Sequence, residues 1–321
     1  MPRRANPTEP LTDQVISTTT FLQASRLAGD RRLRIGRTTV EVTSLDRLYW
    51  PDEGYTKGDL LAYYLSVGKT MLPYLKGRPT ILKRYPNGIQ APMFFQHNVE
   101  DAPDLLQTIE LQSETGRAIN YAVYSDLAAF IYLINIGTIE QHPWHSRVGD
   151  LDHPDYVVFD LDPHGAPFAN VRQVALVMRD VLKELKLTGY PKTSGSAGIH
   201  IYLPVRRRYD YEAVARFAEQ VSERVAERVP RIATVERRIA ERKKGQVYVD
   251  WQQNARGKAA AAVYTVRAKP GASVSTPVTW QEIARGFEIR DFTIKTVPRR
   301  LAKKGDLWRE TFKDRQRLPK L

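Results

Sequence analysis

Residues 155–163 read DYVVFDLDP, and this stretch decides the fold expected for the rest of the chain. Residues 157–159 are β-branched or aromatic and lie between turn-forming residues, which predicts a buried strand. Because side chains alternate along a strand, Asp160 and Asp162 share the face opposite the apolar residues. Two neighbouring carboxylates are unfavourable unless a cation neutralises them. The stretch alone fits either two solvated aspartates or a metal site, and other strands must decide.

Two further strands have the same design. Residues 199–203 read IHIYL, with His200 opposite the apolar side chains, and residues 247–251 read VYVDW, with Asp250 placed likewise. If these strands join the sheet of Asp160 and Asp162, three carboxylates and one histidine converge on a single face. That convergence favours the metal site over solvated aspartates.

The composition points to a polyanionic partner. The chain has 321 residues and a formal net charge of +13, which favours nucleic acid over a membrane surface. It has no cysteine, so disulfides and thiolate metal sites are excluded. The longest apolar stretch, near residues 127–136, is too short to span a bilayer, and the N-terminus has no apolar signal core. We therefore expect a cytoplasmic, nucleoid-associated protein without membrane contact.

The chain reads as one catalytic domain behind an N-terminal arm. Residues 1–30 are polar and proline-containing, which predicts a flexible arm with at most a short helix at its end. Residues 31–321 mix strand and helix patterns without repeats, which predicts a single α+β domain of two lobes around a cleft, with mixed or antiparallel sheets flanked by helices. Within it we expect, among others, helices at 170–187 and 211–229, a strand at 262–267, a capping box from Thr279 to Glu282, and a final helix within 299–320.

Other motifs are weaker. Residues 193–198 read TSGSAG, a loop of small residues that suits either a phosphate-binding nest or a flexible turn. Asp160 begins a calcium-loop pattern that fails at the twelfth position, Val171. His142 and His145 have no third ligand at a convincing spacing, which disfavours zinc.

Possible nucleic-acid contacts are equally ambiguous on their own. Phe94 and Phe95 suit either a stacking platform for bases or a place in the core. Lys83, Arg84 and the basic run 206–208 suit either phosphate contacts or solvated faces.

Taken together, the motifs resemble the archaeo-eukaryotic primase superfamily, and most closely the polymerase domain of bacterial ligase D, a non-homologous end-joining protein. The resemblance runs from about residue 33 to the C-terminus. It rests on the order of these segments: LDRLYWPDEGYTKGDLLAYY, RPTILKRYPNG, MFFQ, IEQHPWHSR, DYVVFDLDP, TSGSAGIHIYLP and VYVDWQQNARGKAAAAVYTVRAKPGASVSTPVTWQEI.

The resemblance implies a role for each matching residue. It implies that the carboxylates hold two Mn²⁺ or Mg²⁺ ions, and that other side chains bind a nucleoside triphosphate (NTP or dNTP), a downstream DNA 5′-phosphate and the template. The metal ligands would be Asp160, Asp162 and Asp250; the nucleotide ligands Lys83, His142, Ser194, Ser196, His200 and Arg267; the 5′-phosphate ligands Arg47 and Lys57; and the template contacts Phe94 and Phe95.

Two positions depart from the family pattern. Ala197 stands where the phosphate loop usually has a basic residue, and Arg47 stands where lysine is common. The first departure weakens the triphosphate grip of the loop or moves it to other side chains.

The resemblance implies a template-directed nucleotidyltransferase that extends 3′ ends at gaps and double-strand breaks, with a DNA ligase and the end-binding protein Ku as partners. A gap-filling enzyme of excision repair or a primase is the alternative within the same fold. A non-catalytic nucleic-acid-binding module is the alternative of another class, which the clustered carboxylates disfavour because without metals they would repel DNA.

Overall fold

The computed structural model describes residues 15–24, 28–112 and 116–321. Of the arm expected over residues 1–30, residues 1–14 lie outside the described part. Val15–Ser17 form strand β1, which pairs in parallel with the next strand, and Thr18–Gln23 form helix α1, which buries Phe21. Folded structure therefore already includes residues 15–23.

Strands dominate the order of elements. The strands are β1 (Val15–Ser17), β2 (Arg31–Ile35), β3 (Thr38–Val42), β4 (Leu48–Trp50), β5 (Tyr55–Thr56), β6 (Pro79–Arg84), β7 (Phe94–Gln96), β8 (Gln107–Gln112), β9 (Ala118–Val123), β10 (Thr138–Pro143), β11 (Tyr156–Asp162), β12 (Tyr190–Thr193), β13 (Ile199–Pro204), β14 (Ala233–Thr234) and β15 (Val247–Asp250). The α-helices are α1 (Thr18–Gln23), α2 (Lys57–Leu75), α3 (Leu127–Asn135), α4 (Phe168–Glu184), α5 (Tyr211–Arg228), α6 (Trp280–Arg285) and α7 (Val297–Lys304).

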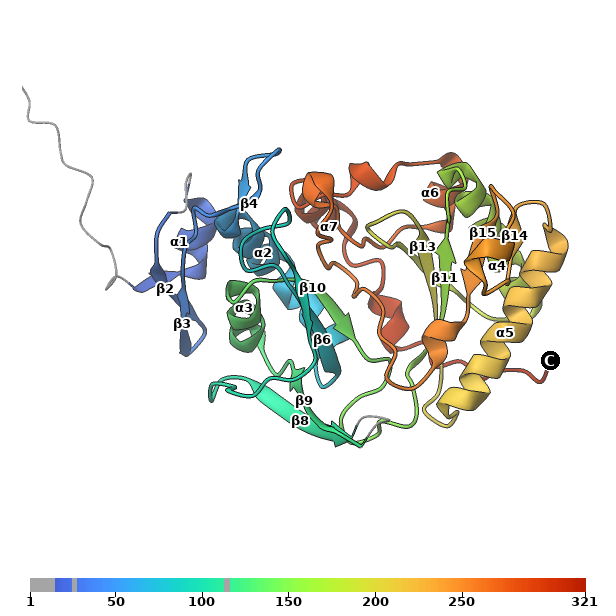
Figure 1. The fold of residues 1–321 in the computed structure, drawn as a ribbon, viewed down its shortest axis with the longest axis horizontal. Helices are drawn as coiled ribbons and strands as arrows, with labels where there is room; N and C mark the ends of the chain where they lie inside the picture. Colours follow the sequence, from blue (N-terminus) through green and yellow to red (C-terminus); the bar gives the residue numbers. More distant parts are fainter. Residues whose placement is uncertain (1–14, 25–27, 113–115) are drawn as a thin grey trace, which may run out of the picture.

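Two larger sheets form the two lobes (Figure 1). The first has the order β10-β6-β9-β8, with β7 also paired to β6, and these neighbouring strands are antiparallel. The second has the order β12-β13-β11-β15-β14, with a single parallel pair, β14 to β15. Helices α4 and α5 pack on the second sheet, and α3 packs on β10 of the first. This arrangement confirms the expected α+β fold with flanking helices.

Capping side chains begin several helices where the sequence indicates. The predicted capping box is present at α6, where the hydroxyl of Thr279 accepts from the Glu282 amide and the Glu282 carboxylate accepts from the Thr279 amide. The same reciprocal pair, Thr56 and Asp59, begins α2. Each box satisfies amides that the first helical turn cannot pair internally.

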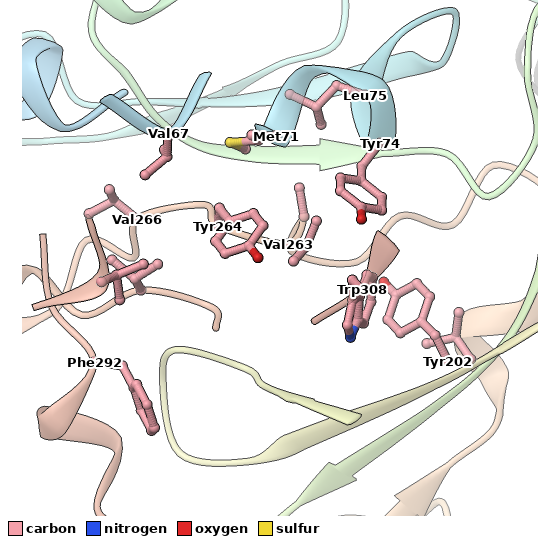
Figure 2. Packing of buried hydrophobic residues seen from close by; sticks show 14 of the residues in the cluster. Val67, Met71, Tyr74, Leu75, Tyr202, Val263, Tyr264, Val266, Phe292 and Trp308 are labelled. Carbon is pink, nitrogen blue, oxygen red and sulfur yellow. The ribbon is translucent and has the colours of Figure 1, made fainter. Parts of the chain in front are cut away.

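The two lobes share one hydrophobic core, and α2 lies on the seam between them. Figure 2 shows Met71 and Tyr74 of α2 opposite Tyr264 and Trp308. The hydroxyl groups of Tyr74 and Tyr264 both donate to the carboxylate of Asp306, at 2.6 and 2.8 Å. Buried aromatic rings whose hydroxyls find such a partner stabilise a core without leaving unsatisfied polar atoms.

Two predicted elements are wrong. Residues 262–267 form no strand, because Tyr264 has a φ of 64° and breaks the extended backbone; an isolated bridge from Val266 to Val274 remains. The expected helix within 299–320 is reduced to α7 and a short 3₁₀ turn, because Gly305, with a φ of 70°, ends α7.

Within the part of the chain that the structure describes, no helix is both long and apolar enough to cross a bilayer.

Candidate active site

A row of four polar side chains crosses the second sheet. Lys192 of β12 is opposite His200 of β13, His200 is opposite Asp160 of β11, and Asp160 is opposite Asp250 of β15. Directly opposed residues of antiparallel strands place their side chains on the same face. The Nε2 atom of His200 lies 3.3 Å from Oδ1 of Asp160, and Nζ of Lys192 lies 2.9 Å from Nδ1 of His200. The three strands therefore lie in one sheet, as the sequence predicts, and they bring Asp160, Asp250 and His200 to one face. Lys192 joins them as a residue that the sequence analysis did not name.

The two other carboxylates lie beside Asp160. Asp162 is two residues further along the same strand face, is exposed, and accepts a hydrogen bond from the amide of His164. Asp250 accepts from the Gln252 amide and from the side chain of Gln253, both at 2.8 Å. Among the described residues, no three His, Cys, Asp or Glu side chains are gathered closely enough to ligate one ion as they stand.

The electrostatics of Asp160 nevertheless fit a cation. Burial, followed by the negative charges of Asp250 and Asp162, raises the pKa of Asp160 to about 7. Carboxylate oxygens are the donors that Mg²⁺ and Mn²⁺ prefer, and a divalent ion beside these groups would reverse the repulsion between them. The donor chemistry of the three aspartates thus suits the two metal ions that the family resemblance implies.

Lys192 is fully buried and makes two specific contacts. Besides its contact with His200, it donates to Oγ of Ser275 at 2.6 Å. Burial, with the charge of Arg267, lowers the pKa of Lys192 well below its usual value. Lys192 therefore fixes the orientation of the His200 ring from the side opposite Asp160.

A second cluster gathers three predicted nucleotide ligands around one residue that the sequence analysis missed, Glu140 of β10. The Glu140 carboxylate is contacted by Lys83 at 3.3 Å, by His142 at 3.1 Å and by Arg267 at 2.9 Å. Arg267 also donates to the backbone carbonyl of Ser194, at 2.7 Å. Arg267 thereby links this cluster to the loop that leads into β13, the strand of His200.

In the loop of small residues, residues 193–198, the side chain of Ser194 makes hydrogen bonds to the backbone of the same loop. The hydroxyl of Ser194 accepts hydrogen bonds from the amides of Ser196 and Gly198, at 3.1 and 2.9 Å. These two amides are thus already paired within the loop. Ala197 is exposed on the same loop. Phosphate binding at this position would depend on side chains around the loop more than on its backbone.

Phe94 and Phe95 are both exposed, at 45% and 53%, but they lie on opposite faces of β7. Phe95 is opposite Lys83, and Phe94 is opposite Arg84. Lys83 lies 5.6 Å from the Phe95 ring centroid, and the Arg84 guanidinium lies 5.1 Å from that of Phe94. Because Lys83 contacts Glu140, Phe95 is on the face of that cluster, and the two rings cannot stack on the same base.

Arg47 and Lys57 form a pair of cations near the start of α2. Arg47 is exposed and donates to the carbonyl of Pro86 and to Oδ1 of Asn87, both at 2.9 Å. Lys57 is buried, and burial together with the charge of Arg47 lowers its pKa to about 8.

A helix N-terminus often binds an anion through its first amides, but the first amides of α2 are already paired. The Lys57 amide donates to the carbonyl of Arg47, the Gly58 amide to that of Leu45, and the Asp59 amide to the hydroxyl of Thr56. The capping box and the preceding loop thus occupy this helix end. The two side chains alone remain for a phosphate.

Comparison with known proteins agrees with this fold. The model of the family described as LigD, primase-polymerase domain, matches residues 56–308. A multifunctional non-homologous end joining protein LigD of Mycolicibacterium smegmatis is 31% identical over 272 residues, which are 84% of this chain and 35% of that protein. The bifunctional non-homologous end joining protein LigD of Bacillus subtilis is 31% identical over 269 residues, which are 83% of this chain and 43% of that protein.

The solved polymerase domain of Mycobacterium tuberculosis ligase D, in complex with DNA, superposes with a TM-score of 0.81 at 30% identity; the match covers 86% of this chain and 99% of that domain. Fold and comparisons together define a polymerase domain of the nucleotidyltransferase type. The chain belongs to the LigD primase-polymerase domain family. It spans about a third to two fifths of the curated relatives described above.

Proposed function

We propose that this chain is a template-directed nucleotidyltransferase that extends 3′ ends at gaps and double-strand breaks during non-homologous end joining. The observation that carries the proposal is the row of His200, Asp160 and Asp250 across three strands, with the Glu140 cluster of cationic side chains beside it. The DNA bound to the Mycobacterium tuberculosis domain and the net charge of +13 support a nucleic-acid partner. A DNA ligase and Ku are the proposed protein partners.

The reaction joins the primer 3′-oxygen to the α-phosphorus of a nucleoside triphosphate and releases pyrophosphate. Asp160, Asp162 and Asp250 would hold two Mg²⁺ or Mn²⁺ ions, which would activate the primer hydroxyl and neutralise the leaving group. Lys83 and Arg267 supply positive charge for the triphosphate. His200, held between Lys192 and Asp160, would contact the phosphates of the nucleotide from the carboxylate face.

Primer extension with Mn²⁺ tests this proposal directly. The substrate is a gapped duplex with a labelled primer, with all four NTPs or dNTPs in separate reactions. Template-dependent addition is the expected result. Binding of the gapped duplex without any addition, with either metal and either kind of nucleotide, would favour a non-catalytic module instead.

The cation pair at α2 leads to a prediction about the downstream end. Gapped DNA with a 5′-phosphate should bind several-fold tighter than the same DNA with a 5′-hydroxyl, because the terminal phosphate brings negative charge and hydrogen-bond acceptors that the hydroxyl lacks. The preference should decline as the pH rises from 7 to 9.5, because Lys57, with a pKa of about 8, loses its charge while Arg47 keeps it. Fluorescence anisotropy at constant moderate salt measures both effects.

Two variants test whether Arg47 and Lys57 cause the preference for a 5′-phosphate. The Arg47→Ala/Lys57→Met double variant should bind the two ends equally and still extend a simple primer-template. Lys295→Met is the control, because Lys295 lies beside the same helix turn but pairs with Asp59 at 2.8 Å. Equal affinity of the unmutated protein for both ends would refute the 5′-phosphate site.

The opposite orientation of the two exposed phenylalanines predicts unequal effects. Phe95→Ala, on the Glu140 face, should lower kcat/KM for the nucleotide by roughly tenfold, the loss of one base-stacking contact. Phe94→Ala should leave the nucleotide KM close to normal and weaken the binding of primer-template DNA. Steady-state extension and DNA anisotropy distinguish the two, and identical phenotypes would contradict separate roles.

A further inference from the structure

Glu140 carries a negative charge among the side chains that are proposed to bind the negatively charged triphosphate. Its side chain is fully buried in β10. Burial alone raises its pKa, but His142, Arg267 and Lys83 outweigh that effect and hold the pKa well below the usual value. Glu140 therefore stays ionised, and its charge repels a triphosphate bound by the same three side chains. Because this repulsion weakens nucleotide binding, Glu140 is expected to contribute to the site in some other way.

All four lone-pair directions that Glu140 offers are used by groups of the site. Oε1 accepts from Lys83 at 3.3 Å and from the Ala268 amide at 3.1 Å. Oε2 contacts His142 at 3.1 Å and accepts from Nε of Arg267 at 2.9 Å. The partners come from β6, from β10 itself and from residues 267–268, three segments far apart in sequence. One carboxylate thus fixes the positions of two cationic side chains, Lys83 and Arg267, and of the His142 imidazole.

We propose that Glu140 is a positioning residue for the nucleotide triphosphate: it holds Lys83, His142 and Arg267 in their binding orientations before the nucleotide arrives. The inference rests on the proposed nucleotidyltransferase function. Long side chains fixed in advance lose less conformational freedom on binding, which raises affinity for the ligand. The need is greater in this chain because Ala197 brings no positive charge to the phosphate loop.

Arg267 transmits this positioning to the loop. With Nε on Glu140, it directs its NH1 group to the carbonyl of Ser194, 2.7 Å away. For His142, the contact between Nε2 and Glu140 makes Nε2 the protonated nitrogen and leaves Nδ1 as an acceptor. Glu140 thus selects the rotamer of Arg267 and the tautomer of His142.

Glu140→Gln separates positioning from simple charge balance, because the two roles predict opposite signs. If Glu140 positions the cations, the amide loses the charge-assisted bonds, the three side chains disperse, and the nucleotide KM rises by about tenfold or more with a smaller change in kcat. If Glu140 serves as a counter-charge alone, the loss of a repelling anion lowers the nucleotide KM. The Kd for gapped DNA should change by less than about twofold.

Asp155→Asn is the matched control. Asp155 is also a fully buried carboxylate, surrounded by Arg78, Arg147 and Arg207, but it directly precedes β11, at the opposite end of that strand from Asp160 and Asp162. Its replacement should lower Tm as Glu140→Gln does and leave the nucleotide KM unchanged. Glu140→Asp is the second variant: it keeps the charge and shortens the reach, so its nucleotide KM should also rise, even if Glu140→Gln folds poorly.

The outcomes are decisive. A lowered KM in Glu140→Gln, or a KM unchanged in Glu140→Asp while Tm falls as in the control, overturns the inference. Binding of inorganic triphosphate to the protein, measured by calorimetry, keeps the test separate from the proposed function. An unmutated protein that extends no primer refutes the function, whereas triphosphate binding that weakens in both Glu140 variants still supports positioning.

Discussion

Asp160→Asn is expected to abolish primer extension and, at pH 8 without added metal, to make the protein more stable than the unmutated chain. The activity falls because the substitution removes a proposed metal ligand at the centre of the polar row, between His200 and Asp250. We expect a loss of at least about a thousandfold, on the order of what removal of a central electrostatic group costs. Primer extension at saturating Mn²⁺ measures it.

The stability gain follows from the raised pKa of Asp160. The folded-state value is about 7, against 3.8 for the ordinary group. Between these values the folded protein binds more protons than the unfolded chain, so the stability of the unmutated, metal-free protein falls as the pH rises from about 4 to 7. The asparagine variant does not titrate and escapes this loss, a gain on the order of 1–3 kcal/mol at pH 8.

Thermal unfolding at pH 4 and pH 8, with and without Mn²⁺, checks the second half of this prediction. Mn²⁺ should raise the Tm of the unmutated protein more at pH 8 than at pH 4, and should hardly change that of the variant. Asp152→Asn, at an exposed residue paired with Arg256, serves as the control. Near-normal extension by Asp160→Asn would reject the metal-ligand assignment whatever its stability.

Gly198→Ala should reduce extension by about a hundredfold or more and destabilise the fold by about 1–3 kcal/mol, the usual range for overpacking. A Cβ at this position would lie 2.2 Å from the backbone carbonyl oxygen of Leu161. Leu161 lies between Asp160 and Asp162, so the carbonyl cannot move without displacing both carboxylates. The glycine is required by close approach, since the loop packs directly on the strand that holds the site.

Ala197→Ser is the matched control for that substitution. It adds one atom to the neighbouring, exposed position of the same loop and should leave extension close to normal. Kinetics and urea unfolding of both variants give the comparison. If Gly198→Ala retains most of its activity, the end of β11 is more adaptable than its contacts indicate.

The sequence predicts those parts of the site that depend on local patterns. Alternation along residues 156–162, 199–204 and 247–250 is enough to place Asp160, His200 and Asp250 on polar strand faces, and the structure pairs these strands in register. Lys192 was within reach of the same reasoning, because it alternates with Tyr190 on β12.

Glu140 was not predictable in this way. Its partner Arg267 is 127 residues distant, and the segment around Arg267 lost its predicted strand to the left-handed backbone of Tyr264. Both the pairing with Arg267 and the loss of that strand depend on long-range packing, which the local alternation of residues does not indicate. The closed amides at the start of α2 and in the loop of Ser194 were missed for a related reason. Hydrogen-bond partners of a helix end or a turn are chosen by the surrounding fold.

The contact between the two lobes along α2 has a consequence for how the nucleotide would be selected. Tyr74 and Tyr264 approach Asp306 from the two lobes and occupy one carboxylate oxygen each, while Met71 packs in an apolar layer between them. Rotation of one lobe against the other would break the bond from Tyr74 to Asp306 and expose that apolar layer to water. We therefore expect the two lobes to move together. If the chain has the proposed polymerase activity, discrimination between correct and incorrect nucleotides would then fall to side chains and loops at the surface more than to closure of one lobe on the other.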